Sequence, residues 1–289
     1  MTSLFTSPQA RQQLLEWYER FHARITAPTE RRTVTTRFGE AHVLVGGPVD
    51  APPVVLLHGA LASSARLVGE LQPLLEHFRV YAVDVVGQSA KSADHQPSVK
   101  NDEYGHWLAD VMDALELPSA RVVGVSWGGF VSLRFAAVAP QRVEKLVLLV
   151  PAGMVTGPLW AGFMKVAWPI MRYRKNPTPE RLRAAMENML STLDDDWLPY
   201  LGVALTSFTP SMSIPKLAKP AEFARFTAPV LVIGGDGDVS FPGHAVGARA
   251  KQLFTGPVTV EVIEGCRHSP PTTDAFRATM SKRVADFLR

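Results

Sequence analysis

A serine between two glycines, at the point where an apolar run gives way to a helical pattern, could be a nucleophile. The segment Gly124-Val125-Ser126-Trp127-Gly128 has the form G-x-S-x-G; the apolar run RVVGV leads into the serine, and the helical pattern GGFVSLRFAAVAP follows. A sharp strand-to-helix turn leaves no room for Cβ atoms at the flanking positions and holds the serine hydroxyl out above the sheet. Free N–H groups at the start of such a helix favour the negative charge that develops in acyl transfer. The pattern predicts that Ser126 is a nucleophile; the alternative is a structural serine in a glycine-rich turn.

The elements around Ser126 indicate an α/β protein. Short runs rich in valine and leucine alternate with helical patterns along most of the chain. Continuous apolar strands separated by helices imply a mostly parallel sheet covered on both faces, with catalytic groups at the carboxyl ends of the strands. The 289 residues, 46% of them hydrophobic, suffice for one large domain or a core plus an insertion. We expect core strands at residues 54–57, 80–83, 122–125, 143–150, 230–233 and 258–263.

The N-terminal region differs from this alternation. Residues 8–25 carry apolar side chains at helical spacing, which predicts an amphipathic helix that packs against the body of the protein. The stretch TVTTRFGEAHVLVGGP then alternates like two half-buried strands with a turn near Phe38-Gly39. We therefore expect a helix and a strand pair ahead of the parallel sheet.

One long interval interrupts the alternation of strands and helices. It lies between the strand that ends at Val150 and the one that starts at Val230, and Thr178-Pro179-Glu180 within it has the N-cap, proline and acid of a helix start. We interpret it as a helical cap, residues 152–226, inserted into an α/β core formed by residues 1–151 and 227–289.

Further motifs complete a resemblance to a known family. His58-Gly59 ends a predicted strand, and DVVGQSAKS follows the next one. Together with the serine segment they resemble the motifs of the α/β-hydrolase fold superfamily, in particular its capped, esterase-like serine hydrolases, over nearly the whole chain. Ser89 stands where the family's D-x-x-G-x-G-x-S loop usually has its second glycine. The resemblance implies an oxyanion hole formed by the backbone N–H groups of Ala60 and Trp127; we interpret His58 as a structural residue that braces the loop.

The resemblance also implies the partners of the serine, because the family's catalytic residues follow the order serine, acid, histidine. In LVIGGDGDVSF the family's G-x-x-D pattern, counted from Gly235, places the acid at Asp238, with Asp236 as the alternative. VIEGCRHSPP follows the last predicted strand, where G-x-G-H is common, so His268 is the candidate general base, although Arg267 replaces the second glycine. The carboxylate would hold the imidazole in the right tautomer and stabilise the imidazolium.

The activity implied by the resemblance is hydrolysis of a carboxylic ester through an acyl-enzyme, without a cofactor or metal. Serine at the nucleophile position, where epoxide hydrolases and haloalkane dehalogenases have aspartate, argues against those classes. The cap is rich in tryptophan and methionine, so we expect a small to medium apolar substrate and pocket residues among Leu61, Trp160, Met164 and Trp168. Packing of the cap against the core would explain most of these side chains equally well. A C–C bond hydrolase, a lactonase, a perhydrolase or a ligand-binding protein without turnover could use the same residues.

Composition argues against other classes of protein. The net charge of +3 comes from scattered lysines and arginines, so we expect no nucleic-acid partner. No G-x-G-x-x-G follows a strand and no G-K-[ST] occurs, so no nucleotide cofactor is implied. Asp194-Asp195-Asp196 is more typical of a helix cap than of a metal site. We interpret Cys266, at the end of a strand, as a packing residue rather than a nucleophile.

The expected compartment is the reducing cytoplasm. The single cysteine cannot form an internal disulfide, and the N-terminus lacks the apolar core of a signal peptide. Residues 146–164 are uncharged and nearly long enough to span a bilayer, but prolines and glycines interrupt them. We therefore predict a strand, a loop and a new helix rather than a membrane span. We expect a monomer or homodimer that acts on a small-molecule ester without stable membrane insertion.

Overall fold

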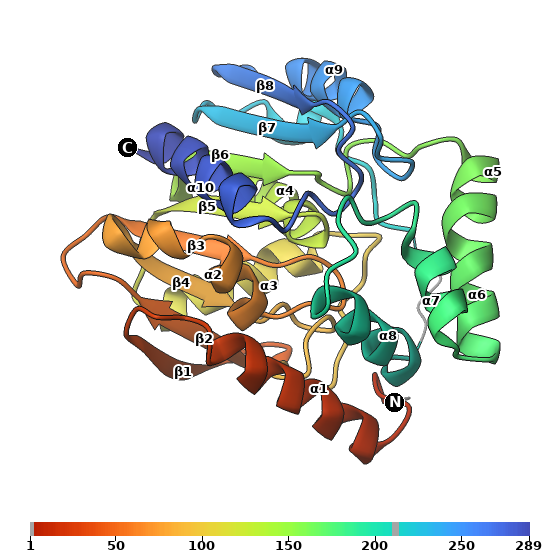
Figure 1. Ribbon diagram of the computed structural model, residues 1–289. Coiled ribbons are helices and arrows are strands. Elements are labelled where there is room, and N and C mark those ends of the chain that lie inside the picture. Colours follow the sequence, from red (N-terminus) through yellow and green to blue (C-terminus); the bar gives the residue numbers. More distant parts are fainter. Residues whose placement is uncertain (1–2, 210–213) are drawn as a thin grey trace.

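A twisted, mostly parallel sheet forms the centre of the protein (Figure 1). The computed structural model describes residues 3–209 and 214–289. Within them, strands pair in the order β1-β2-β4-β3-β5-β6-β7-β8; β2 is antiparallel to β1 and β4, and the remaining neighbours are parallel. The predicted α/β-hydrolase fold is confirmed. The strands are β1 Thr29–Thr36, β2 Gly39–Gly46, β3 Pro53–Leu57, β4 Arg79–Val83, β5 Ala120–Val125, β6 Val143–Leu149, β7 Val230–Gly235 and β8 Val258–Ile263.

Helices cover both faces of the sheet, so each strand contributes to two apolar cores. On β3, Val55 and Leu57 pack with residues of α3, α4 and α9, while Val54 and Leu56 pack with residues of α1, α2 and α10. This explains why the strands read as continuous apolar runs rather than alternating ones. The core helices are α1 Pro8–His22, α2 Ser64–Glu70, α3 Glu103–Ala114, α4 Trp127–Val138, α9 Gly243–Leu253 and α10 Asp274–Leu288, with the short η1 Gln72–Glu76 and η2 Pro140–Arg142.

The predicted N-terminal helix is present as α1, which ends at His22 rather than at residue 25. The Ser7 hydroxyl accepts a hydrogen bond from the Ala10 N–H, so the helix begins with a side-chain cap followed by a proline. Its apolar face is buried, and the Phe21 ring packs against Tyr200 with ring centroids 5.2 Å apart. Because Tyr200 belongs to α8, the N-terminal helix supports a segment far away in the sequence.

The chain between β6 and β7 is largely helical and lies beyond the carboxyl ends of the strands, at the right of Figure 1. The stretch 146–164 is divided into the end of β6, a loop, α5 and the start of η3, which agrees with the predicted strand, loop and new helix. Within the described residues, no helix has the length and apolar character needed to cross a membrane. The elements of this insert are α5 Leu159–Gly162, the π-helical η3 Phe163–Ala167, α6 Trp168–Lys175, α7 Pro179–Met186, α8 Trp197–Ser207 and η4 Pro220–Phe223.

A proline inside the first helical stretch of the insert does not end it. The helix continues through Pro169 to Lys175, with a π-helical segment just before the proline. Proline has no N–H and would leave the carbonyl of Lys165, four residues earlier, without its helical partner. The side-chain amide of Asn188 donates a hydrogen bond to that carbonyl at 3.2 Å. The π-helical turn and this tertiary hydrogen bond together accommodate the proline.

Candidate active site

The backbone at Ser126 is a sharp strand-to-helix turn. Ser126 has φ 51° and ψ −108°, which L-residues rarely adopt, and it joins β5 directly to α4. A Cβ on Gly124 would lie 2.4 Å from the carbonyl oxygen of Gly128, and one on Gly128 would lie 2.1 Å from the carbonyl oxygen of Leu57. Both glycines of the G-x-S-x-G segment are therefore required by close backbone contacts.

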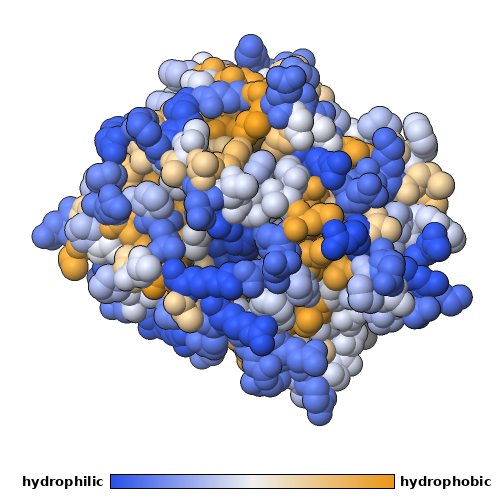
Figure 2. All heavy atoms as spheres, in the orientation of Figure 1, coloured by the Kyte–Doolittle hydropathy of each residue, from blue (hydrophilic) through white to orange (hydrophobic). Residues whose placement is uncertain are grey.

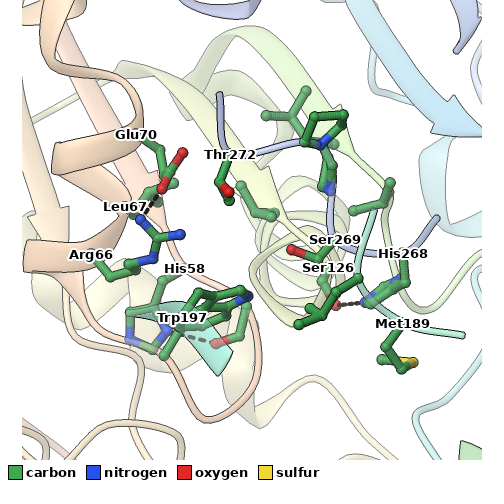
Figure 3. A pocket seen from close by; sticks show the side chains of 18 of the residues that line it. His58, Arg66, Leu67, Glu70, Ser126, Met189, Trp197, His268, Ser269 and Thr272 are labelled. Carbon is green, nitrogen blue, oxygen red and sulfur yellow. Dashed lines mark hydrogen bonds and ion pairs between the residues drawn. The ribbon is translucent and has the colours of Figure 1, made fainter. Parts of the chain in front are cut away.

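The structure brings Ser126, His268 and Asp238 together from three separate loops. The Ser126 hydroxyl donates to His268 Nε2 at 2.8 Å, as Figure 3 shows, and His268 Nδ1–H donates to Asp238 Oδ2 at 2.8 Å. These residues follow β5, β8 and β7, whose carboxyl ends meet at one edge of the sheet. Asp236, the alternative acid, is exposed to solvent. The geometry thus favours Asp238 over Asp236.

Asp238 is held in its ionised form. Its side chain is buried, and its Oδ1 accepts hydrogen bonds from the N–H groups of Ser240 at 2.8 Å and Phe241 at 3.0 Å. Burial acts to raise the pKa of Asp238, but the hydrogen bond and charge of His268, together with the two backbone N–H groups, outweigh it and lower the pKa. An ionised Asp238 can only accept, which assigns the proton to His268 Nδ1 and leaves Nε2 free to accept from the serine.

The loop that carries His268 is fastened to the insert. The Ser269 N–H donates to the Met189 carbonyl at 2.7 Å, and the Ser191 N–H donates to the Ser269 carbonyl at 3.0 Å. The Arg267 N–H donates to the Ser191 hydroxyl at 2.8 Å, and its guanidinium donates to the Leu190 carbonyl at 3.1 Å. Arg267, which replaces the usual glycine, therefore helps to fix the histidine loop. The sequence alone gave no signal for Ser191.

A second buried polar group supports the loops beside the serine. His58 Nδ1–H donates to the Gly59 carbonyl at 2.7 Å, and His58 Nε2 accepts from the Val85 N–H at 2.9 Å. Burial lowers the pKa of His58, so the ring is neutral and has both nitrogens occupied; this is the bracing geometry expected from the sequence. Ser89 donates to the buried carboxylate of Asp84 at 2.6 Å, which gives the serine at the usual glycine position a structural role.

The two predicted oxyanion donors lie beside the serine. Trp127 is the first residue of α4, so its N–H has no acceptor within the helix. Ala60 lines the same cavity as Ser126 and His268. Their positions are compatible with the oxyanion hole implied by the sequence, and that role stays a prediction.

A cavity of about 300 Å³ opens onto the Ser126 hydroxyl and the His268 ring. Its wall combines core residues, among them the predicted Leu61, with side chains from the insert. Most of these side chains are apolar, as expected for a pocket that takes the apolar part of a small ligand. The residues contributed by the insert include Ile170, Met186, Met189, Leu190, Trp197, Leu201 and Leu205.

The structure does not bring Trp160, Met164 and Trp168 to this cavity. All of them are exposed on the outer face of the α5 to α6 stretch, whereas Ile170 of α6 lines the cavity. Both tryptophans are exposed, which agrees with the expectation from their spacing that they share a face. The prediction that they line the pocket is wrong, because that face points away from the core.

One part of the cavity wall is polar, which the sequence analysis missed. Figure 3 shows Arg66 and Glu70 across the cavity from Ser126 and His268. Glu70 pairs with Arg66, and it accepts from Arg277 Nε at 2.7 Å. The Arg66 guanidinium also lies 4.8 Å from the Trp197 ring centroid, and burial lowers the pKa of Arg66 to about 10. The four-residue spacing of Arg66 and Glu70, which brings two side chains together on a helix, was the only signal in the sequence.

The remaining candidates have structural roles. Asp194 accepts from the Asp196 N–H at 3.0 Å and from the Trp197 N–H, so its carboxylate binds the start of α8, whose N-cap residue is Asp196. No group of side chains in the described residues is suited to hold a metal ion. Cys266 is buried beside the cavity, and burial raises the pKa of its thiol, which keeps the thiol protonated and a poor nucleophile.

The fold and the site together define an α/β hydrolase, and comparison with known proteins agrees. Residues 52–190 match the model of the alpha/beta hydrolase fold family. The chain is 30% identical to the uncharacterized carboxylesterase nap of Bacillus subtilis (strain 168) over 81% of its own length and 79% of that protein. The chain belongs to the α/β-hydrolase fold family and is an enzyme of this class.

Solved structures resemble the whole chain. Naproxen esterase from Bacillus subtilis superposes with a TM-score of 0.84 at 23% identity, covering 98% of this chain and 99% of that one. A meta-cleavage product hydrolase from Pseudomonas fluorescens IP01 superposes with a TM-score of 0.70 at 19% identity, covering 89% of this chain and 96% of that one. At these identities the similarity establishes the fold.

Proposed function

We propose that this enzyme is a carboxylesterase that hydrolyses a small to medium apolar ester through an acyl-enzyme on Ser126. The observation that carries the proposal is the chain of hydrogen bonds from the Ser126 hydroxyl through His268 to Asp238, each 2.8 Å long, at the wall of an apolar cavity. The similarity of this chain to carboxylesterase nap, over most of both chains, favours an ester as the substrate.

The proposed reaction has two half-reactions, acylation of Ser126 and hydrolysis of the acyl-enzyme, and each passes through a tetrahedral intermediate. Ser126 Oγ attacks the ester carbonyl while its proton moves to His268 Nε2, and the negative oxygen is held by the N–H groups of Ala60 and Trp127. The imidazolium, stabilised by ionised Asp238, then protonates the departing alcohol as the C–O bond breaks. Water attacks the acyl-enzyme with His268 as base, and the acid product leaves with Ser126 restored.

The cavity supports an apolar substrate enclosed between core and insert. Because Ile170, Met186 and Leu201 come from the insert and face the same cavity as Ser126, we infer that residues 152–226 act as a cap over the core 1–151 and 227–289. The ester would be a free small molecule. We further propose a cytoplasmic enzyme, monomeric or homodimeric, on the ground of its single, buried cysteine.

The alternative is cleavage of a C–C bond, because a meta-cleavage product hydrolase shares the fold. A discriminating experiment measures turnover of p-nitrophenyl acetate and butyrate, a lactone and a vinylogous diketone, together with labelling by a fluorophosphonate probe. We expect ester turnover and labelling, with labelling abolished and kcat lowered by about 10⁴-fold or more in Ser126→Ala. Turnover of the diketone alone would favour the C–C hydrolase, and labelling without any turnover would favour a ligand-binding protein.

A further inference from the structure

The outer face of the insert exposes a continuous set of large apolar side chains. Leu159, Trp160, Phe163, Met164, Trp168 and Met171 are between 45% and 75% exposed. They form two adjacent pairs, residues 159/160 and 163/164, and the pairs, Trp168 and Met171 follow one another at intervals of three or four residues along α5, η3 and α6. This spacing places them on one broad side of the helical stretch. The opposite face is used by the protein itself, since Ala161 and Tyr173 are buried and Ile170 lines the cavity. We call the exposed set the outer apolar face.

The helical stretch that carries this face has positively charged side chains and no negatively charged ones. The seventeen-residue stretch 159–175, LWAGFMKVAWPIMRYRK, contains Lys165, Arg172, Arg174 and Lys175 and no aspartate or glutamate. Arg174 is turned towards the body of the protein, where it donates to the carbonyl of Phe208 at 3.0 Å. In the part of the chain that the structure describes, Lys165, Arg172 and Lys175 form no ion pair. Their charge is available to an external partner.

We propose that the outer apolar face binds reversibly to an anionic lipid surface. A helix that carries tryptophan, phenylalanine and leucine on one face and lysine and arginine beside it lies in the interfacial plane, with its apolar face at the headgroup boundary. Tryptophan side chains are favoured at that depth, and the face contains two of them, Trp160 and Trp168. Figure 1 shows that α5 and α6 form an outer edge of the molecule, from which a flat surface can be approached.

A second copy of the chain fits this face less well than lipid does. In a two-fold symmetric dimer the same patch meets itself. The cations of one stretch would then face those of its partner, and neither stretch offers a carboxylate to compensate. An anionic bilayer supplies both the apolar layer and the opposite charge. Charge complementarity therefore selects the lipid surface.

Flotation with lipid vesicles tests the proposal and does not depend on ester turnover, so its failure would leave the proposed function untouched. The full chain is mixed with vesicles of phosphatidylcholine alone or with added phosphatidylglycerol, at low and at high salt. We expect partition to anionic vesicles that weakens with salt, and a loss of about fivefold for each cation removed near the surface. The double variant Lys165→Gln/Lys175→Gln should therefore bind anionic vesicles about 25-fold more weakly.

Matched variants separate this face from unspecific adsorption. Trp160→Ser/Trp168→Ser should lower binding to both kinds of vesicle, because it removes apolar area rather than charge. Val49→Ser, which changes another strongly exposed apolar residue, and Lys251→Gln on α9 should bind like the wild type. The proposal is overturned if anionic vesicles do not bind the protein, or if the control variants lose as much binding as the others. Light scattering that shows a dimer abolished by Trp160→Ser/Trp168→Ser would instead assign the face to a second copy.

Discussion

Arg267 joins the loop of His268 to the insert: its backbone N–H donates to the Ser191 hydroxyl at 2.8 Å and its guanidinium to the Leu190 carbonyl at 3.1 Å. The His268 imidazole is therefore positioned in part by Ser191 and Leu190, which lie 76 and 77 residues before Arg267 in the sequence. A flexible glycine, usual at this position in the family, would not make the side-chain bond. The insert thus affects both the shape of the cavity and the placement of His268, the proposed general base.

Ser191→Ala and Arg267→Ala should lower kcat with little change in KM. Each substitution frees the histidine loop, and loss of alignment at a distance from the chemistry costs up to about 10²-fold, so we expect about tenfold in each variant. The rate of fluorophosphonate labelling of Ser126 should fall in parallel. Thr192→Ala, beside Ser191, is the control. An unchanged labelling rate in both variants would show that these contacts only stabilise the fold.

Asp238→Asn should lower kcat by about 10³- to 10⁴-fold, because an amide can donate to His268 and favour the wrong tautomer. Asp236→Asn should have a much smaller effect, since Asp236 is exposed and Asp238 accepts the His268 Nδ1–H. Both variants are compared by kcat for p-nitrophenyl butyrate. The reverse order of the two losses would contradict the assignment of the acid.

Ile170→Trp should narrow the cavity and change the preference for acyl chains. Ile170 lines the cavity of about 300 Å³, so a larger side chain there competes with the apolar part of the substrate. We expect kcat/KM for an octanoate ester to fall about 10- to 200-fold relative to that for acetate. Val49→Trp, at an exposed site outside the insert, is the control. Equal losses for both esters would place the acyl pocket elsewhere.

Glu222→Gln should destabilise the protein at neutral pH, and the effect should disappear in acid. Glu222 accepts from the fully buried Arg134 at 3.0 Å and pairs with Lys216 at 2.6 Å. Burial acts to raise the pKa of Glu222, but these hydrogen bonds outweigh it and lower the pKa from 4.5 to about 2. A carboxylate whose pKa is lower in the folded state than in the unfolded state stabilises the folded state at any pH above its unfolded-state pKa. This stabilisation is lost as the pH falls towards its folded-state pKa.

The free energy of unfolding should therefore fall by about 1 to 3 kcal/mol in Glu222→Gln near pH 7, because Arg134 loses a charged acceptor. The difference from the wild type should shrink between pH 4.5 and about 2. Urea denaturation across this range measures it, with the exposed Glu76→Gln as the control. A difference that stays constant with pH would mean that packing, and not the ion pair, is lost.

The amino-acid sequence by itself determined the α/β fold and the strand-to-helix turn at Ser126. Short, valine-rich apolar runs between helical patterns are typical of strands buried on both faces. Gly124 and Gly128 are needed by backbone contacts within a few residues of Ser126 or on the adjacent strand. Such local requirements leave a pattern in the sequence. The loop position of Asp238 and His268 followed from their place after predicted strands.

Only the tertiary structure decided which face of the insert points inwards. Helical spacing showed that Trp160 and Trp168 share a face, but the direction of that face depends on how α6 packs on residues distant in the sequence. The tertiary structure likewise places the buried Asp238, and not the exposed Asp236, against His268, and it joins Ser191 to the histidine loop. Contacts of this kind link residues with no spacing relationship along the chain, so they leave no periodic signal that sequence analysis can detect.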